Sequence, residues 1–196
     1  KEVLSRKPEY VYQIEKERAG SYQIEVLAKS KEHEVPIPLR FQELRDEQMQ
    51  PAHGELPFFL QENTVIQFLQ YPYEQVVAEN FVEILEKMEL INDLSCYEEI
   101  YGILKKEALD GRKVEQQIIE IGTKRELFFG KDRLDTVLHY KDYTYMKRKW
   151  TAYLKRERKK EPDWVEVMTL LEAFFPPVWR AIIRDEIFIG DWMPEL

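Results

Sequence analysis

Residues 73–91 read YEQVVAENFVEILEKMELI and carry the clearest structural signal in the chain. Apolar side chains recur here at every third or fourth position, which places them on one side of an α-helix. The members of this stripe are Val77, Phe81, Ile84, Leu85 and Met88. The spacing therefore predicts an amphipathic helix that buries the stripe in a core.

The same periodicity continues after residue 91. Asp110, in the sequence LDG, is expected to cap a helix over residues 113–121, which Gly122 is expected to interrupt. Before it, a shorter helix is predicted from the spacing of Tyr97, Ile100, Tyr101 and Leu104. After it, a helix is predicted from the spacing of Met146, Trp150, Tyr153 and Leu154.

The last clear helix is expected to begin at Pro162, because proline is favoured at the first position of a helix. It is expected to end at Pro176 and Pro177, since proline has no N–H to continue the hydrogen bonding. A short tail helix is expected over residues 178–187. The sequence therefore predicts a bundle of five to six helices.

The N-terminal part has a different pattern. Two β-rich runs within residues 9–29 flank the turn sequence RAGS and predict a hairpin. A third extended piece, residues 35–41, contains two prolines and is expected at a sheet edge or outside the sheet. The polar stretch 45–57 suggests a boundary. We expect an α+β fold with a small β-rich part over residues 1–57 and a helical bundle over 58–196, with only helices after residue 57.

Composition excludes several classes of protein. With 196 residues of which 44% are apolar, the chain can fill a core and is not disordered. A net charge of −8 excludes a protein that coats nucleic acid with its whole surface. The one cysteine excludes an internal disulfide and fits a reducing cytoplasm. No apolar run approaches the roughly 20 residues of a membrane span, and residues 1–10 do not resemble a signal peptide, so a cytoplasmic protein is expected.

The charge is unevenly distributed along the chain. Residues 141–160, KDYTYMKRKWTAYLKRERKK, contain nine basic and two acidic residues, a local charge of +7 that leaves −15 for the remainder. On a helical projection Tyr143 joins the apolar stripe of this segment. The opposite face and its flanks carry Arg148, Lys155, Lys159, Lys149 and Arg156. Such a face could follow a phosphate backbone, could be a solvated face paired with acidic neighbours, or could contact a protein.

Residues typical of catalytic or metal sites are sparse. The three histidines, His33, His53 and His139, are far apart in the sequence and predict no metal site. Cys96 has no neighbouring cysteine or base and is expected to be a buried thiol. Glu25 lies on a predicted strand, where the flanking apolar residues face the other way, and one carboxylate does not make a metal site.

Four motifs resemble the C-terminal portion of the bacterial abortive-infection nucleotidyltransferase family, the AbiEii-like toxins. Residues 71–81, YPYEQVVAENF, are similar to the family's YP-x-E-x-x-x-AEKF. Residues 97–101, YEEIY, stand where the family has a KDFYDLY-like turn, and residues 109–114, LDGRKV, resemble its DG-x-x-L. Residues 149–154, KWTAYL, resemble its W-x-x-F/Y-L helix, and a closing helix that ends in prolines follows.

The resemblance implies a nucleotidyltransferase fold, in which a sheet bearing metal-binding carboxylates precedes a helical bundle. It implies transfer of a nucleotide from a Mg²⁺-bound nucleoside triphosphate to an acceptor, which is tRNA for some relatives. It also implies a cognate antitoxin as a protein partner. The N-terminal β part would then be what remains of the nucleotidyltransferase sheet.

The chain departs from the family at the positions that matter for catalysis. The Gly-Ser plus D-x-D element is absent from these residues. Asn80 replaces the lysine of AEK, Ser95 and Cys96 replace the KD pair, and Glu99 keeps an acid. These departures indicate either a non-catalytic relative or a chain whose catalytic part precedes residue 1. We therefore expect weak or no binding of a Mg²⁺–nucleotide.

Three hypotheses follow. In the first, the bundle holds an RNA, and Glu25 would be a remaining metal-facing carboxylate. The former nucleotide pocket would be lined by Asn80, Cys96 and Glu99. The phosphates would be contacted by Arg148, Lys149, Lys155 and Arg156. In the second, the chain is a protein-binding module, for instance for an antitoxin. The aromatic tail 187–194 suggests it, since such a cluster either docks on its own core or marks an interface. In the third, the likeness is architectural only.

Overall fold

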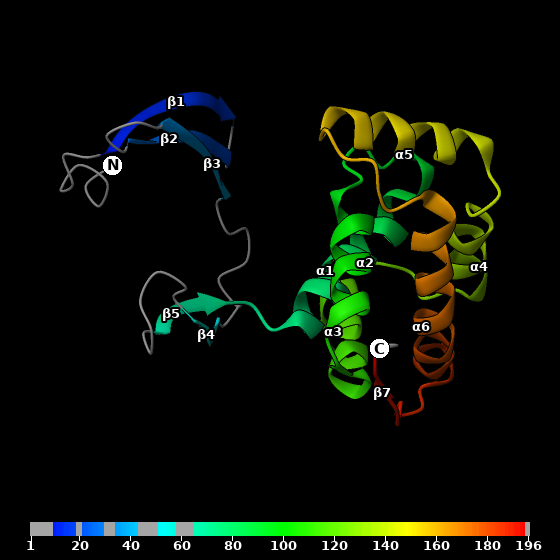
Figure 1. Ribbon diagram of the computed structural model, residues 1–196. Coiled ribbons are helices and arrows are strands. Elements are labelled where there is room, and N and C mark those ends of the chain that lie inside the picture. The colour runs from blue at the N-terminus through cyan, green and yellow to red at the C-terminus, as the bar shows by residue number, and fades with distance from the viewer. Residues whose placement is uncertain (1–9, 19–20, 30–33, 43–50, 58–64, 195–196) are drawn as a thin grey trace. The chain divides into compact units, whose positions relative to one another are not determined.

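The computed structural model describes residues 10–18, 21–29, 34–42, 51–57 and 65–194 of the chain (Figure 1). The chain divides into two units, Lys1–Gln50 and Pro51–Leu196. The division between Gln50 and Pro51 lies inside the polar stretch 45–57. Strands dominate the first unit and helices the second, so the α+β class predicted from the sequence is confirmed.

The described residues of the first unit form an antiparallel sheet. Its strands are β1 (Tyr10–Arg18), β2 (Ser21–Lys29) and β3 (Glu34–Gln42), in the order β1-β2-β3. The predicted hairpin is confirmed, with a shift of register between Ile14 and Lys16. β3 occupies an edge, as its prolines predict: Pro36 stands opposite Leu27 and Pro38 opposite Glu25.

A separate two-stranded hairpin follows in the second unit. β4 (Ala52–Pro57) pairs antiparallel with β5 (Val65–Gln70). The expectation of helices alone after residue 57 is therefore wrong. The sequence of β5, VIQFLQ, is rich in β-branched and aromatic residues that favour a strand.

Six α-helices occur in the described residues. They are α1 (Tyr73–Lys87), α2 (Ser95–Lys106), α3 (Gly111–Lys124), α4 (Lys131–His139), α5 (Thr144–Arg156) and α6 (Trp164–Arg184). A 3-10 turn, Met88–Leu90, follows α1. The helices predicted from apolar spacing are confirmed, although α1 ends at Lys87 and not at residue 91. The Asp110 side chain caps α3 by accepting a hydrogen bond from the Lys113 amide at 3.2 Å. α4 was not predicted, because its buried stripe consists of Leu134 and Val137 alone.

Gly122 does not interrupt α3, which continues to Lys124. The glycine is buried, and a β-carbon at this position would lie 2.5 Å from the ring of Phe129. The residue therefore allows a close contact between the helix and the following loop instead of ending the helix.

The predicted end of the last helix at Pro176 and Pro177 is also wrong. α6 begins at Trp164, with Asp163 as its N-cap, and runs through both prolines to Arg184. Residues 178–184 of the predicted tail helix are the final part of the same helix, and residues 185–187 lie beyond its end. Residues on both sides of the prolines are buried, namely Phe174, Phe175, Val178 and Trp179. Their burial keeps the two halves in one helix despite the missing N–H groups.

Aromatic side chains form the centre of the bundle. α1 contacts α2 and α3, and α6 contacts α2, α3, α4 and α5 (Figure 1). Phe81 of α1 and Phe175 of α6 stack with ring centroids 3.7 Å apart. Each of the four tryptophans donates its indole N–H to a backbone carbonyl, which satisfies the polar atom inside the core.

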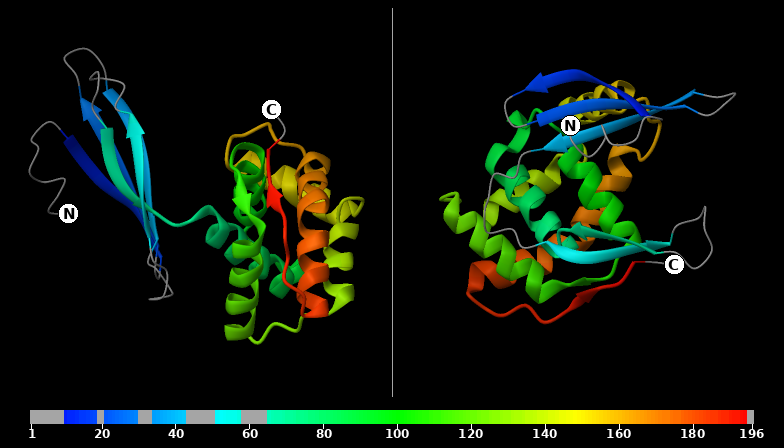
Figure 2. Two further views of the ribbon diagram at one scale, coloured as in Figure 1. Left: turned by 90° about the horizontal axis from the view of Figure 1, so that it is seen from below. Right: turned by 90° about the vertical axis from the view of Figure 1, so that its left-hand side faces the viewer.

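The C-terminal segment docks on the bundle between α3 and α6 (Figure 2). Its strand β7 (Asp191–Trp192) pairs with β6 (Leu109–Asp110). The Phe188 amide donates to the buried carboxylate of Glu115 at 3.0 Å, and the Trp192 indole donates to the Leu104 carbonyl at 2.7 Å. Gly111 permits this approach, since a β-carbon there would lie 2.2 Å from the Gly190 carbonyl oxygen. Of the two alternatives for the tail, docking on its own core is confirmed for Phe188 and Trp192.

None of the described helices is long and apolar enough to cross a lipid bilayer.

Candidate nucleic-acid interface

The basic segment forms α5, and its apolar side packs as predicted. Met146, Trp150, Tyr153 and Leu154 are buried. Trp150 also donates its indole N–H to the Pro162 carbonyl at 2.9 Å. Tyr143 is not part of the buried stripe: it is 47% exposed, because it precedes the helix as the N-cap and does not continue the helical spacing. The burial of one side of α5 fixes which side faces solvent.

The solvent-facing side of α5 carries a shallow pocket. It is lined by Thr144, Lys147, Arg148, Thr151, Ala152 and Lys155. Arg148 and Lys155 are exposed, and neither makes a hydrogen bond or an ion pair within the described residues. They are seven positions apart in the sequence, which corresponds to about 10 Å along a helix. We call Arg148 and Lys155 the free cation pair, since both charges are available to a ligand.

The other predicted phosphate contacts have partners in the protein. Lys149 donates to the carbonyls of Glu89, at 3.0 Å, and of Ile91. Arg156 pairs with Glu157 at 3.1 Å, and its guanidinium lies 5.3 Å from the centre of the Tyr153 ring. These cations hold α5 in place or are neutralised locally.

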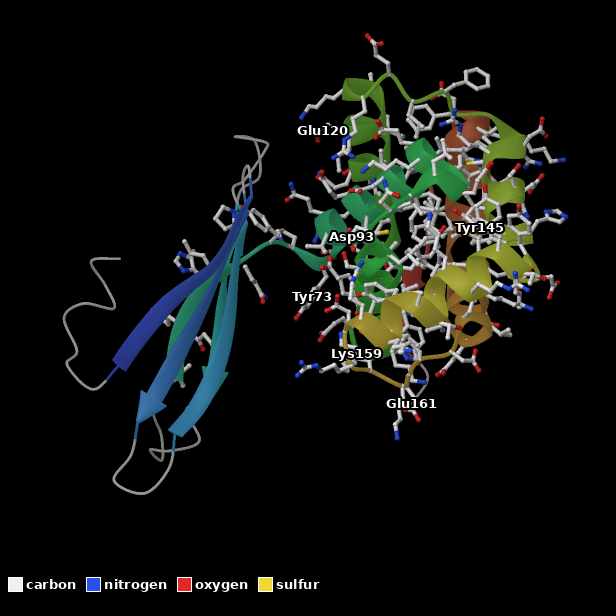
Figure 3. All side chains as sticks on the ribbon, turned by 90° about the horizontal axis from the view of Figure 1, so that it is seen from above. Tyr73, Asp93, Glu120, Tyr145, Lys159 and Glu161 are labelled. Atoms are coloured by element: carbon white, nitrogen blue, oxygen red, sulfur yellow. The ribbon has the colours of Figure 1, made fainter. Side chains whose placement is uncertain are left out.

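Other cations of the segment are paired as well. Lys159 lies 2.5 Å from a Glu98 oxygen, Lys141 pairs with Glu172 at 2.7 Å, and Lys147 lies 3.6 Å from Asp142. Figure 3 shows Lys159 and Tyr145 toward opposite ends of α5. The interpretation as a face paired with acidic neighbours therefore fits most cations of the segment. The interpretation as a face that could follow a phosphate backbone fits the free cation pair on the outer side of α5.

Two tyrosine–carboxylate hydrogen bonds secure α5 and the residues before it. The Tyr153 hydroxyl donates to Glu98 at 2.5 Å, and the Tyr140 hydroxyl donates to Glu89 at 2.7 Å. Burial, and then the hydrogen bond to the carboxylate, raises the pKa of both phenols well above the ordinary value. The Tyr140 hydrogen bond in turn lowers the pKa of Glu89. Both tyrosines are therefore held neutral and act as donors.

We expect four tyrosines to resist ionisation until the chain unfolds. Burial raises the pKa of Tyr97, Tyr101, Tyr140 and Tyr153. An unfolded tyrosine ionises near pH 10, so the stability contributed by these groups is complete below about pH 10 and is lost as the pH rises further. Ultraviolet absorbance of tyrosinate during an alkaline titration should show a late step that coincides with loss of helical circular dichroism. Titration of all 11 tyrosines in one step, with the helices intact, would contradict this assignment.

The residues predicted to line a nucleotide pocket partly meet between α1 and α2. The Asn80 amide donates to a Glu99 carboxylate oxygen at 2.9 Å. Cys96 is buried, as expected, and its thiol donates to the Asp93 carbonyl at 3.3 Å. Burial raises the pKa of this thiol, and the charges of Glu83, Asp93 and Glu99 raise it further.

This environment does not fit a nucleoside triphosphate. An acidic surrounding repels phosphate, and an amide that is bonded to a carboxylate supplies no positive charge. Within the described parts of the chain, no group of three or more His, Cys, Asp or Glu side chains could hold a metal ion. Glu25 lies in β2 of the first unit, opposite Gln13 of β1 and Pro38 of β3. His53 and His139 are exposed, and His33 lies outside the described residues.

No protein-family model, curated protein or solved structure matches this chain.

Sequence reasoning overlooked several residues of the outer side of α5. Lys147, Thr144 and Thr151 line the pocket beside the free cation pair. Thr144 and Thr151 stand four and three residues from Arg148, and Lys147 stands three and four residues from those two threonines, which is the signal that would have placed all three there. The sequence prediction placed Tyr143 in the buried stripe and gave Tyr145 no role, whereas both rings are about half exposed.

Proposed function

We propose that this chain is an RNA-binding relative of the AbiEii-like nucleotidyltransferase toxins, and that the outer side of α5 contacts the RNA phosphates. The free cation pair carries the proposal. Arg148 and Lys155 are exposed, unpaired within the described residues and presented by a helix whose other side is buried. Each positive charge that neutralises a phosphate releases condensed counterions, which favours binding.

The charge distribution supports a localised contact. The chain carries −8 overall, so most of its surface repels RNA. The segment 141–160 has the opposite sign, and its remaining unpaired cations include Arg158 and Lys160, next to the end of α5. An RNA is therefore expected to contact the face formed by this segment and not the acidic remainder of the surface. The cytoplasm, where an unpaired cysteine such as Cys96 stays reduced, is the compartment we propose.

The proposal assigns no nucleotide to the Asn80–Glu99 pair. Its acidic surroundings disfavour a triphosphate, and no catalytic step is derived for Glu25. The family resemblance contributes tRNA as the RNA to test first.

The test is the binding of fluorescently labelled tRNA to the intact chain, followed by anisotropy over a series of salt concentrations. We expect binding at low salt that weakens steeply as salt increases, because counterion release becomes less favourable. Binding that is absent at low salt, or that does not respond to salt, would contradict a phosphate interface on α5.

A second candidate function is protein binding through the C-terminal segment. Ile187, Ile189 and Met193 remain 65%, 92% and 70% exposed while their neighbours dock on the bundle. Exposed apolar side chains of this kind suit a protein partner such as an antitoxin. Binding of such a partner would respond little to salt, so the salt series separates the two candidates.

A further inference from the structure

Two exposed aromatic rings stand at the start of α5, next to the free cation pair. Tyr143 is 47% exposed and Tyr145 is 49% exposed. Their ring centroids lie 5.9 Å apart with an angle of 47° between the ring planes. Neither hydroxyl makes a hydrogen bond within the described residues. Within the described residues, neither ring belongs to the hydrophobic core.

Neighbouring side chains of the protein hold the two rings in position. Tyr143 contacts Tyr140, with ring centroids 6.0 Å apart, and Tyr140 is buried and anchored by its hydrogen bond to Glu89. On the other side, the Lys149 ammonium lies 5.4 Å from the centre of the Tyr145 ring, while it is itself held by backbone carbonyls. The two rings are therefore placed before any ligand binds, which lowers the entropy lost on binding.

The rings are also close to the proposed phosphate contacts. Tyr145 precedes Arg148 by three residues, so the two side chains are neighbours on the helix surface. Thr144, between the two tyrosines, lines the same pocket as Arg148 and Lys155. Exposed aromatic rings beside cations are the arrangement by which proteins bind unpaired nucleotides, with the bases stacked on the rings and the phosphates on the charges.

We infer that the α5 face binds single-stranded RNA, and that Tyr143 and Tyr145 stack against unpaired bases. This inference rests on the proposed function and names its substrate class. A duplex keeps its bases stacked on one another, so it could use Arg148 and Lys155 but not the two rings. The tyrosines therefore give the face a preference for unpaired over paired RNA.

The test compares a labelled single-stranded oligonucleotide with the same strand annealed to its complement, by anisotropy with the intact chain. The variant Tyr143→Leu/Tyr145→Leu should bind the single strand roughly tenfold more weakly or worse, because base–aromatic stacking is lost. Its affinity for the duplex should stay within about twofold of the native value, since the phosphate contacts remain. Phe128→Leu, at a 75% exposed ring outside the helices, is the matched control and should change neither affinity.

The outcomes separate the inference from the function on which it rests. The inference is supported if the tyrosine variant loses affinity for the single strand but not for the duplex, and Phe128→Leu changes neither affinity. If the tyrosine variant and the native chain bind the single strand with equal affinity, the inference is wrong. In that case the proposed function still stands if Arg148→Gln/Lys155→Gln weakens binding to the single strand and to the duplex. Absence of binding to both RNAs overturns the proposed function and the inference with it.

Discussion

Replacement of Trp150 by alanine is expected to lower the free energy of unfolding by about 3–5 kcal/mol. Trp150 is buried and its ring lies against Trp164, with centroids 5.6 Å apart, and against Tyr153, at 5.1 Å. Removing it leaves a cavity between α5 and α6 and deprives the Pro162 carbonyl of its donor. Chemical denaturation followed by far-ultraviolet circular dichroism measures the change.

Trp150→Phe is the control for this substitution. It keeps an aromatic ring in the core but removes the indole N–H. The free energy of unfolding should therefore fall by less, about 1–3 kcal/mol, because of the unsatisfied carbonyl and the smaller ring. If Trp150→Ala were as stable as the native chain, α5 would not be packed by this side. The assignment of the opposite side to solvent would then be wrong.

The double charge reversal Arg148→Glu/Lys155→Glu is expected to weaken RNA binding roughly 10- to 100-fold at low salt. Both side chains are exposed and unpaired within the described residues, so the folded state should lose no contact. The free energy of unfolding should therefore change by less than about 0.5 kcal/mol. Anisotropy with labelled RNA measures the first effect and denaturation the second.

The matched control is Arg112→Glu/Lys131→Glu. These cations are also exposed and unpaired within the described residues, but they lie on α3 and α4. The two double variants change the net charge equally. A similar loss of RNA affinity in both would mean that RNA responds to total charge and not to the α5 face.

The helices were predictable where a long apolar stripe fixes the buried side. Residues 73–87 and the residues around Trp150 behave as their spacing predicts, because the stripe itself forms the core. The predicted helix extends to residue 91, but Met88 caps α1 and is only partly buried. The sequence prediction ends the last helix at Pro176 and Pro177, because the low helix propensity of proline opposes a helix there. The burial of Phe175 and Trp179 outweighs that propensity and is visible only in the packed structure.

The candidate interface was predictable only in part. The sequence identifies a basic helix, but it does not say which charges are already paired. Lys149 meets the Glu89 carbonyl and Lys159 meets Glu98, and about 60 residues of sequence separate each pair. Arg148 and Lys155 could be recognised as free only once those partners were placed. Tyr143 was assigned to the apolar stripe because helical spacing was extended across the N-cap, where it does not apply.

The most direct measurement is the salt dependence of RNA binding, compared between the native chain and Arg148→Gln/Lys155→Gln. The logarithm of the binding constant should fall linearly with the logarithm of the salt concentration for the native chain. Removal of two phosphate contacts should make the slope shallower by roughly 0.7 for each contact on a single strand. Equal slopes for the two proteins, or a native affinity that does not change with salt, would contradict an RNA interface on the outer side of α5.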